Sequence, residues 1–428
     1  MIRRFDMNFT KIENKRVGEH YFRMEHPSGL TILVYPKKGF NSVYASIGTK
    51  FGSIYSRFMF NGKEVAVPDG TAHYLEHKLF ESEDGDAFQK YAKTGASANA
   101  FTSFDMTCYL FSCTDRFSES LKILIDLMQS PYFTKETVAK EQGIIGQEIK
   151  MYDDSPDWRV MMNLFGGLYH KHPINIDIAG SVESIAEITP EILYECYNSY
   201  YNLHNMVLTV VGCADPEEVL NIVEKNIKPS SPVDTKLILP DEPYDVVKNY
   251  TEQIMPVAVP MFELGFKEKC TDKYVTNKEH VCTSVLMNAF AGESSKLYRE
   301  LMDKNLINAS FGFEYLEGLG YRSMIMSGET KDPSAVSEII NDAVRKLHKT
   351  GIGSEEFETA RKAVYGRLIS AFDSKQAIAS ELISGEFTGR EIYGAVDEIA
   401  GLTLEDVNER LESQLDADNC CLSVVKGE

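Results

Sequence analysis

Two histidines stand four residues apart in the stretch TAHYLEHKLF, positions 71 to 80, and a glutamate directly precedes the second. Residues i and i+4 share one face of a helix, so His73 and His77 would project together with Glu76 beside them. Two imidazoles from one turn can hold a Zn²⁺ ion, and a neighbouring carboxylate can act as a general base. A third protein ligand would have to come from elsewhere in the chain. The alternative is a pair of partly buried helix residues that bind no metal.

The elements around this stretch are predicted to alternate between strands and helices. Asp69, Gly70 and Thr71 provide a plausible helix start just before the histidines. Runs rich in β-branched residues predict strands, and apolar spacings of three and four predict helices. The strands are expected at 30–36, 43–53, 106–113 and 206–212, and the helices at 69–82, 117–130 and 134–154.

The order of elements is predicted to occur twice. Residues 226–243 contain four prolines and few helix signals, which is typical of a linker. Beyond it, 353–369 aligns weakly with 133–149, and 402–426 aligns weakly with 188–212. The repeated order is two helices, a helix that starts at a threonine, and a terminal apolar strand. We interpret the chain as two copies of one unit of about 200 residues, a common domain size.

The two copies differ at the residues that carry chemistry. Glu141 and Glu148 of the first copy align with Arg361 and Leu368 of the second, which also lacks a counterpart of HYLEH. The first half is therefore expected to be the chemical half. We predict an α+β fold of two homologous halves. The expected divisions are a zinc-binding catalytic domain at 1–228, a linker at 229–245 and a homologous non-catalytic domain at 246–428.

Composition excludes several classes of function. Asp and Glu number 64 against 44 Lys and Arg, and the net charge of −20 opposes binding to nucleic acids or anionic membranes. The sequence shows no apolar signal region and no run near the ~18 apolar residues of a membrane span. Its eight cysteines include no C-x-x-C pair, which favours reduced thiols in a cytoplasmic protein.

The motif HYLEH has the H-x-x-E-H order of the inverzincin signature. It resembles the active-site motif of the insulinase/pitrilysin family, the M16 metallopeptidases. In that family a glutamate about seventy residues further on completes the zinc site, and an acidic residue seven positions earlier supports it. The stretch EQGIIGQE supplies Glu141 and Glu148 at this spacing. The resemblance covers nearly the whole chain and looks closest to the bacterial processing-peptidase branch. It implies the LuxS/MPP-like metallohydrolase fold, in which each half is a mostly antiparallel sheet with helices packed on one face.

The resemblance implies a role for each of these residues. His73, His77 and Glu148 look like the ligands of one Zn²⁺ per chain, and Glu76 looks like the general base. Glu141 looks like a carboxylate that orients a ligating histidine; the alternative is a solvated helix carboxylate.

The stretch GASANAFTSFDMTCYLFSC, at 95–113, resembles the substrate-binding edge strand of the family. Asn99, Ala100 and Phe101 then look like backbone partners of an extended peptide. The implied function is a zinc-dependent endopeptidase that cleaves short or unfolded peptides inside a clam-shell chamber. The rival functions are a non-catalytic family member kept for assembly, and a zinc hydrolase acting on other substrates.

One pair of family residues is missing. Many relatives carry an arginine and a tyrosine seven residues apart in the second half, where Met302 and Ala309 align here. Tyr298, Arg299 and Tyr315 lie nearby without reproducing the pair. Relatives work as pairs of two-domain subunits, so the expected partner is a second M16-fold chain that carries the missing pair; a homodimer is the alternative. In the heterodimer, this chain would be the subunit that carries the zinc motif.

Overall fold

The computed structural model describes residues 9–269, 271 and 273–428. Cys270 and the first eight residues of the expected N-terminal domain lie outside the described part. The seven described cysteines are all free thiols, and all but Cys213 are buried.

The chain forms two compact units that are each assembled from several segments. Unit 1 contains residues up to 149 together with 177–238 and 371–392, and unit 2 contains 150–176, 239–370 and 393–428. Residues 150–176 thus come from the first half of the sequence but belong to unit 2. Residues 371–392 come from the second half but belong to unit 1.

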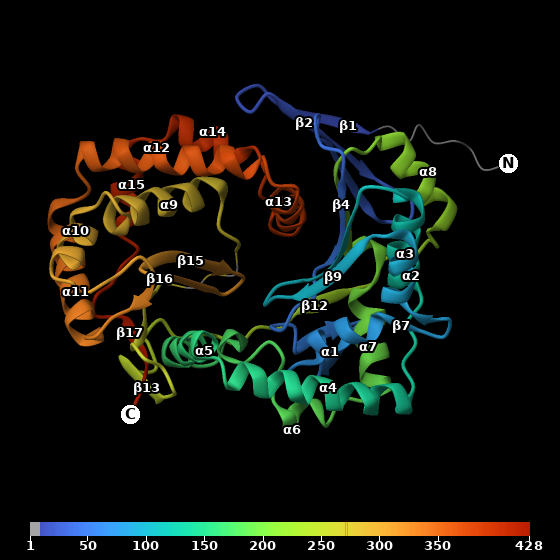
Figure 1. Ribbon diagram of the computed structural model, residues 1–428, viewed down its shortest axis with the longest axis horizontal. Coiled ribbons are helices and arrows are strands. Elements are labelled where there is room, and N and C mark those ends of the chain that lie inside the picture. The colour runs from blue at the N-terminus through green and yellow to red at the C-terminus, as the bar shows by residue number, and fades with distance from the viewer. Residues whose placement is uncertain (1–8, 270, 272) are drawn as a thin grey trace. The chain divides into compact units, whose positions relative to one another are not determined.

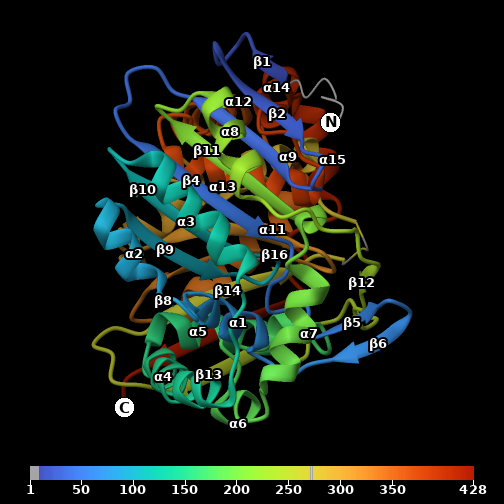
Figure 2. The ribbon, with the colours of Figure 1, turned by 90° about the vertical axis from the view of Figure 1, so that its right-hand side faces the viewer.

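Unit 1 is built on a seven-stranded sheet (Figures 1 and 2). Its neighbouring strands run antiparallel except β3 and β11, which are parallel. Short pairs β7–β8 (Glu81–Ser82, Gly85–Asp86) and β5–β6 (Arg57–Phe60, Lys63–Ala66) lie outside this sheet. In spatial order the sheet contains β1 (Thr10–Asn14), β2 (Glu19–Glu25), β3 (Thr31–Pro36), β11 (Met206–Gly212), β4 (Val43–Thr49), β10 (Thr107–Cys113) and β9 (Ser97–Thr102).

Helices cover both faces of this sheet. In Figures 1 and 2, α3 and α8 lie on one side of β4, and α13 lies on the other and packs against β4 and β11. The helices of this unit are α1 (Thr71–Leu79), α2 (Ala87–Thr94), α3 (Phe117–Gln129), α4 (Lys135–Asp153, whose last turn passes into unit 2), α6 (Val182–Ile185), α7 (Pro190–Tyr200), α8 (Pro216–Asn226) and α13 (Lys375–Thr388).

Unit 2 has a five-stranded sheet with the order β13 (Tyr250–Ile254), β17 (Cys420–Lys426), β14 (Met261–Lys267), β16 (Tyr321–Glu329) and β15 (Gly312–Gly318). Only the β13–β17 pair is parallel. Its helices are α5 (Pro156–Leu168), α9 (Asn277–Ala291), α10 (Lys296–Asp303), α11 (Pro333–Thr350), α12 (Ser354–Ala371), α14 (Gly394–Gly401) and α15 (Leu404–Leu411).

The predicted repeat appears as a repeated sheet topology. The order β3-β11-β4-β10-β9 and the order β13-β17-β14-β16-β15 have the same sequence of parallel and antiparallel pairs. Helices α5 and α13 occupy equivalent places in the repeat, and each packs on the sheet of the unit built mainly from the other half. The α+β fold with two related halves is thus confirmed, and the exchanged helices add a second covered face to each sheet.

The expected domain boundaries stay a sequence-based prediction. Part of the expected linker forms β12 (Thr235–Leu237), which pairs with β5 of unit 1. The strand expected at 43–53 ends at Thr49. Beyond that point, the backbone N–H groups of Ser53 and Ile54 donate to the carbonyls of Ser103 and Phe104, so the chain leaves the sheet.

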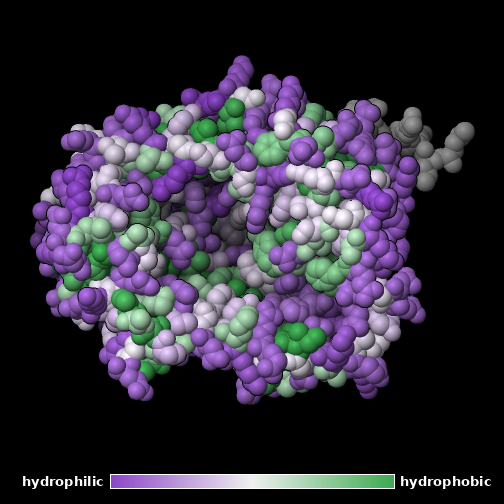
Figure 3. Space-filling model, viewed as in Figure 1, coloured by the Kyte–Doolittle hydropathy of each residue, from purple (hydrophilic) through white to green (hydrophobic). Residues whose placement is uncertain are grey.

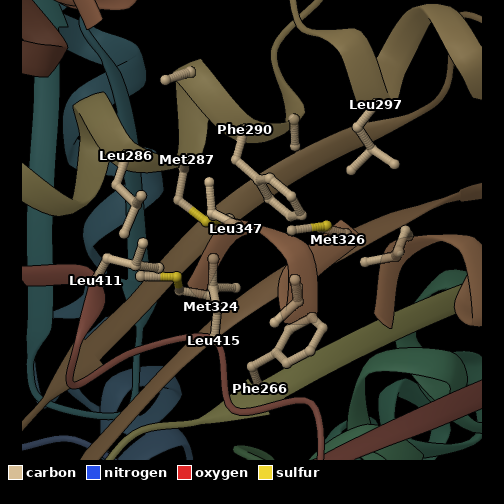
Figure 4. Close-up of a cluster of buried hydrophobic side chains, with 14 of the residues drawn as sticks. Phe266, Leu286, Met287, Phe290, Leu297, Met324, Met326, Leu347, Leu411 and Leu415 are labelled. Carbon is tan, nitrogen blue, oxygen red and sulfur yellow. The ribbon is translucent and has the colours of Figure 1, made fainter. Parts of the chain in front are cut away.

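The core of unit 2 buries a large share of the apolar side chains of that unit. Its buried cluster brings β14 and β16 against α9, α10, α11 and α15, and Figure 4 shows ten of its labelled side chains packed together. The face seen in Figure 3 is covered mainly by hydrophilic residues, with small hydrophobic patches. This distribution agrees with the strongly acidic composition.

Candidate metal centre

The helix that carries the histidines begins at a backbone position that only glycine suits. Gly70 precedes α1 with a φ of 87°, and a Cβ there would meet the carbonyl oxygen of Ala179 at 2.3 Å. Almost every residue of α1 is buried. Tyr74 donates a hydrogen bond to the Val138 carbonyl, which ties α1 to α4. The two helices are therefore held together independently of any metal.

Three of the predicted ligands meet at this junction. Nε2 of His73 lies 3.6 Å from Oε1 of Glu148, and Nε2 of His77 lies 3.3 Å from Oε2 of the same carboxylate. One ligand atom from each of the three residues lies within 4.8 Å of the others. Two imidazoles and a carboxylate are a donor set that suits Zn²⁺ with a position left for water.

Glu141 contacts the same histidine from the other side. Its Oε1 lies 3.1 Å from His77 Nδ1, so His77 keeps Nε2 free to face Glu148. The side chain of Glu141 is buried, unlike the solvated carboxylate considered from sequence. The hydrogen bond from His77 holds the pKa of Glu141 below its ordinary value. Burial acts against the charged form of His77, but the hydrogen bonds to Glu141 and Glu148 outweigh it and raise the His77 pKa to about 10.

These contacts test whether the residues fit a zinc ion. His77 lies between the carboxylates of Glu141 and Glu148, and a cation is electrostatically favoured beside two such groups. His73 adds a second observation, because its Nε2 also faces Glu148, at 3.6 Å, so both imidazoles present the same ring nitrogen to one carboxylate. The residues present therefore fit a zinc ion held by both Nε2 atoms and Glu148.

Glu76 lies on α1, between His73 and His77 in the sequence. It is 8% exposed, and burial raises the pKa of its carboxyl group, with the charge of Glu148 acting in the same direction. The hydroxyl of Thr102, at the end of β9, donates to its Oε2 at 2.7 Å. A carboxylate whose pKa is raised in this way holds a proton more firmly than an exposed one, which suits a group that must accept a proton and then release it.

The predicted substrate-binding residues lie on an edge strand. Within the described part of the chain, β9 pairs only with β10, with Asn99 opposite Leu110 and Phe101 opposite Cys108. The outer edge of β9 therefore offers backbone groups to an added strand. Helix α1 packs against β9, so this edge adjoins the histidine motif.

The positions expected to hold an arginine and a tyrosine lie in unit 2. Met302 is on α10 and is 40% exposed, and Ala309 is an exposed residue of the turn before β15. The Tyr315 hydroxyl donates to Glu268 at 2.9 Å and accepts a hydrogen bond from Arg410 at 3.0 Å. Tyr315 is thus engaged in a buried network of its own unit.

Sequence reasoning missed three side chains near Glu76. These are Thr102 and the buried tyrosines 109 and 201, whose hydroxyls lie 2.9 Å apart. Burial raises the pKa of Tyr109 well above its ordinary value, and the charge of Glu76 contributes to the shift. Strand alternation was an available signal for Thr102, since it shares a face of β9 with Ala100.

Comparisons with known proteins identify the family of this chain. Residues 63–181 match the family model of the insulinase family, peptidase family M16, and residues 187–364 match the one described as the peptidase M16 inactive domain. The uncharacterized zinc protease YmfH of Bacillus subtilis strain 168 is 40% identical over 414 residues, covering 95% of this chain and 96% of that protein. The chain belongs to peptidase family M16. Its candidate metal ligands all lie in the first matched segment, and the second half matches a domain described as inactive.

Two further similar proteins show how widely the likeness extends. The crystal structure of a putative M16-like peptidase from Alicyclobacillus acidocaldarius superimposes with a TM-score of 0.90 at 30% identity, covering all of both chains. A probable mitochondrial-processing peptidase subunit beta of Arabidopsis thaliana is 27% identical over 182 residues, covering 41% of this chain and 34% of that protein. No helix within the described ranges combines the length and apolar character needed to cross a membrane.

Proposed function

We propose that this member of family M16 is a zinc-dependent endopeptidase that hydrolyses short or unfolded peptides. The observation that carries the proposal is that His73 and His77 of α1 meet Glu148 of α4. Glu76 lies beside the two histidines on α1. Family membership and the zinc-protease name of its 40% identical relative support a peptidase. A subunit kept only for assembly would have no chemical reason to retain this set.

His73, His77 and Glu148 would hold the zinc ion, and Glu141 would keep the His77 ring oriented through Nδ1. When bound, zinc supplies Lewis acidity, which activates water and polarises a carbonyl near neutral pH. Glu76 accepts a proton from the attacking water and passes it to the amine that leaves. Its burial excludes bulk water from the carboxyl group and keeps the proton available for that second transfer.

The peptide would bind as an added strand along β9, beside Asn99, Ala100 and Phe101. Main-chain hydrogen bonds would then supply affinity with little dependence on sequence, which suits unfolded substrates. A chamber around the substrate stays a prediction from the family resemblance.

The test is cleavage of an internally quenched peptide library by the zinc-loaded chain, with Glu76→Gln as the comparison. We expect the variant to bind zinc as the wild type does and to lose turnover by at least about 100-fold, the size of a general-base contribution. A chelator should abolish cleavage, and added zinc should restore it. Equal cleavage by wild type and Glu76→Gln would disprove the role of Glu76.

The second candidate is a subunit that becomes active only with a partner. It is favoured by Met302 and Ala309, which stand where many family members carry the arginine and tyrosine. We propose that the partner is a second M16-fold chain that carries this pair. The name of the Arabidopsis relative, a subunit beta, supports an assembly of this kind. We also propose a cytoplasmic location for this chain.

A further inference from the structure

The hydroxyl of Thr102 makes a direct contact with the proposed general base. It lies 2.7 Å from Oε2 of Glu76, and Glu76 makes no other side-chain hydrogen bond with the described residues. Thr102 is the last residue of β9, while Glu76 is on α1, 26 positions earlier in the sequence. The contact therefore joins the proposed base to the strand on which the peptide is proposed to bind.

The direction of this hydrogen bond follows from its neighbours. The hydroxyl oxygen of Thr107 lies 3.3 Å from that of Thr102. The Thr107 hydroxyl donates to the Phe51 carbonyl at 2.8 Å. A hydroxyl has one proton, so the Thr107 proton is already used. An ionised carboxylate only accepts, so the proton of Thr102 points to Glu76 Oε2. The Thr107 side chain is fully buried, which keeps Thr102 from turning toward solvent on that side.

We infer that Thr102 is a positioning residue for Glu76, and that its hydroxyl holds Oε2 so that Oε1 takes the proton of the attacking water. This inference rests on the proposed function. In the step, an O–H bond of water breaks, an Oε1–H bond forms, and the water oxygen bonds to the scissile carbonyl carbon. The proton then moves from Oε1 to the leaving nitrogen as the C–N bond breaks. Thr102 keeps its hydrogen bond to Oε2 throughout.

The placement of Thr102 on β9 has a kinetic consequence. The backbone of β9 would hold the peptide whether or not residue 102 has a hydroxyl, because strand pairing uses main-chain groups. Loss of the hydroxyl would leave the carboxylate of Glu76 free to turn. The effect should therefore fall on kcat, with KM little changed.

Two substitutions separate the hydroxyl from the shape of the side chain. Thr102→Val keeps the shape and removes the hydroxyl, and Thr102→Ser keeps the hydroxyl. We expect Thr102→Val to lower kcat roughly 10- to 100-fold, the loss typical of one hydrogen bond to a charged group. Thr102→Ser should stay within about threefold of wild type. Zinc content and Tm of both variants verify that the site is formed.

A double variant tests whether Thr102 acts through Glu76. In the Glu76→Gln background, Thr102→Val should bind a quenched peptide with unchanged affinity and should not lower the residual rate further. An unchanged kcat in zinc-loaded Thr102→Val, or an equal loss in Thr102→Ser, overturns the inference while the proposed function stands. A wild type that cleaves no peptide, either alone or as the complex isolated from its own cells, overturns both.

Discussion

At the scale of single residues, the candidate centre has one imidazole held between two carboxylates. Glu141 contacts His77 at Nδ1, and Glu148 lies near its Nε2. The two glutamates are seven positions apart on α4, which is two helical turns, so both side chains point to the same histidine. In the proposed function, Glu148 would bind the metal and Glu141 would orient the ring.

The role of Glu141 can be tested with a matched change on the same helix. We expect Glu141→Gln to weaken zinc binding about 10- to 100-fold, because the neutral amide no longer supports the His77 ring as a charged acceptor. Glu136→Gln, at an exposed position of α4, should leave the affinity unchanged. The measurement is competition with a zinc chelator of known affinity. Equal affinities in both variants would remove Glu141 from the zinc site.

Zinc binding should also depend on pH through His77. Its pKa of about 10 in the metal-free fold means that a proton must leave this ring before zinc binds. Zinc affinity should therefore fall about tenfold for each pH unit below 10 through this residue alone. Since the folded pKa lies above the ordinary 6.5, the protonated ring stabilises the metal-free fold fully below pH 6.5, and the stabilisation is lost as the pH rises through 10.

Calorimetry in buffers of different ionisation enthalpy measures the protons released per zinc bound. We expect fewer protons from Glu141→Gln than from wild type near pH 8, because the hydrogen bond that contributes most to raising the His77 pKa is gone. Identical proton release in the two proteins would contradict this account of His77.

At the scale of elements, β14 carries a carboxyl group that burial keeps neutral. Burial, followed by the charges of Glu314 and Asp157, raises the pKa of Glu263 to about 8. Its Oε2 is buried without a hydrogen-bond partner among the described residues, which suits a protonated carboxyl. Asp157 lies on α5, the helix that unit 2 receives from the first half of the sequence.

The buried carboxyl group of Glu263 should lower the free energy of unfolding as the pH rises. Because the folded pKa of Glu263 is raised above 4.5, its contribution is fully present below pH 4.5 and is lost as the pH rises through about 8. Glu263→Gln should therefore gain free energy of unfolding relative to wild type between pH 5 and pH 8, by at most about 4 kcal/mol. Denaturant unfolding at several pH values measures this gain. Glu252→Gln on the exposed side of β13 is the control, and a gain that does not change with pH would refute the expectation.

At the scale of the whole molecule, the two halves share a topology but differ in chemistry. Unit 1 holds the candidate ligands, and unit 2 holds Arg361 and Leu368 on α12, the helix equivalent to α4. The missing arginine–tyrosine pair leads to a prediction about assembly. Native mass spectrometry of the complex isolated from its own cells should find a second M16-fold chain with this pair. A fully active complex made of this chain alone would argue against such a partner.

Much of the site was predictable because it depends on local periodicity. The spacing in HYLEH places His73 and His77 on one helical face, and the spacing of seven places Glu141 and Glu148 on another. The weak repeat also indicated the shared order of elements, because helix and strand patterns depend on residues that are near in sequence. Family resemblance was still needed to connect the two helices, whose contact between His77 and Glu141 spans 64 positions.

Local sequence patterns were enough to predict several of the elements, their twofold repetition and the histidine pair that can hold a metal. The folded chain was needed to show which atoms meet: the burial of Glu141, the hydrogen bond from Thr102 to Glu76, and the exchange of α5 and α13 between the two units. The physical reason is that burial and hydrogen bonding depend on groups distant in the chain. Periodicity tells which face of an element is apolar, but many partners satisfy one apolar face, and packing of the whole chain selects among them.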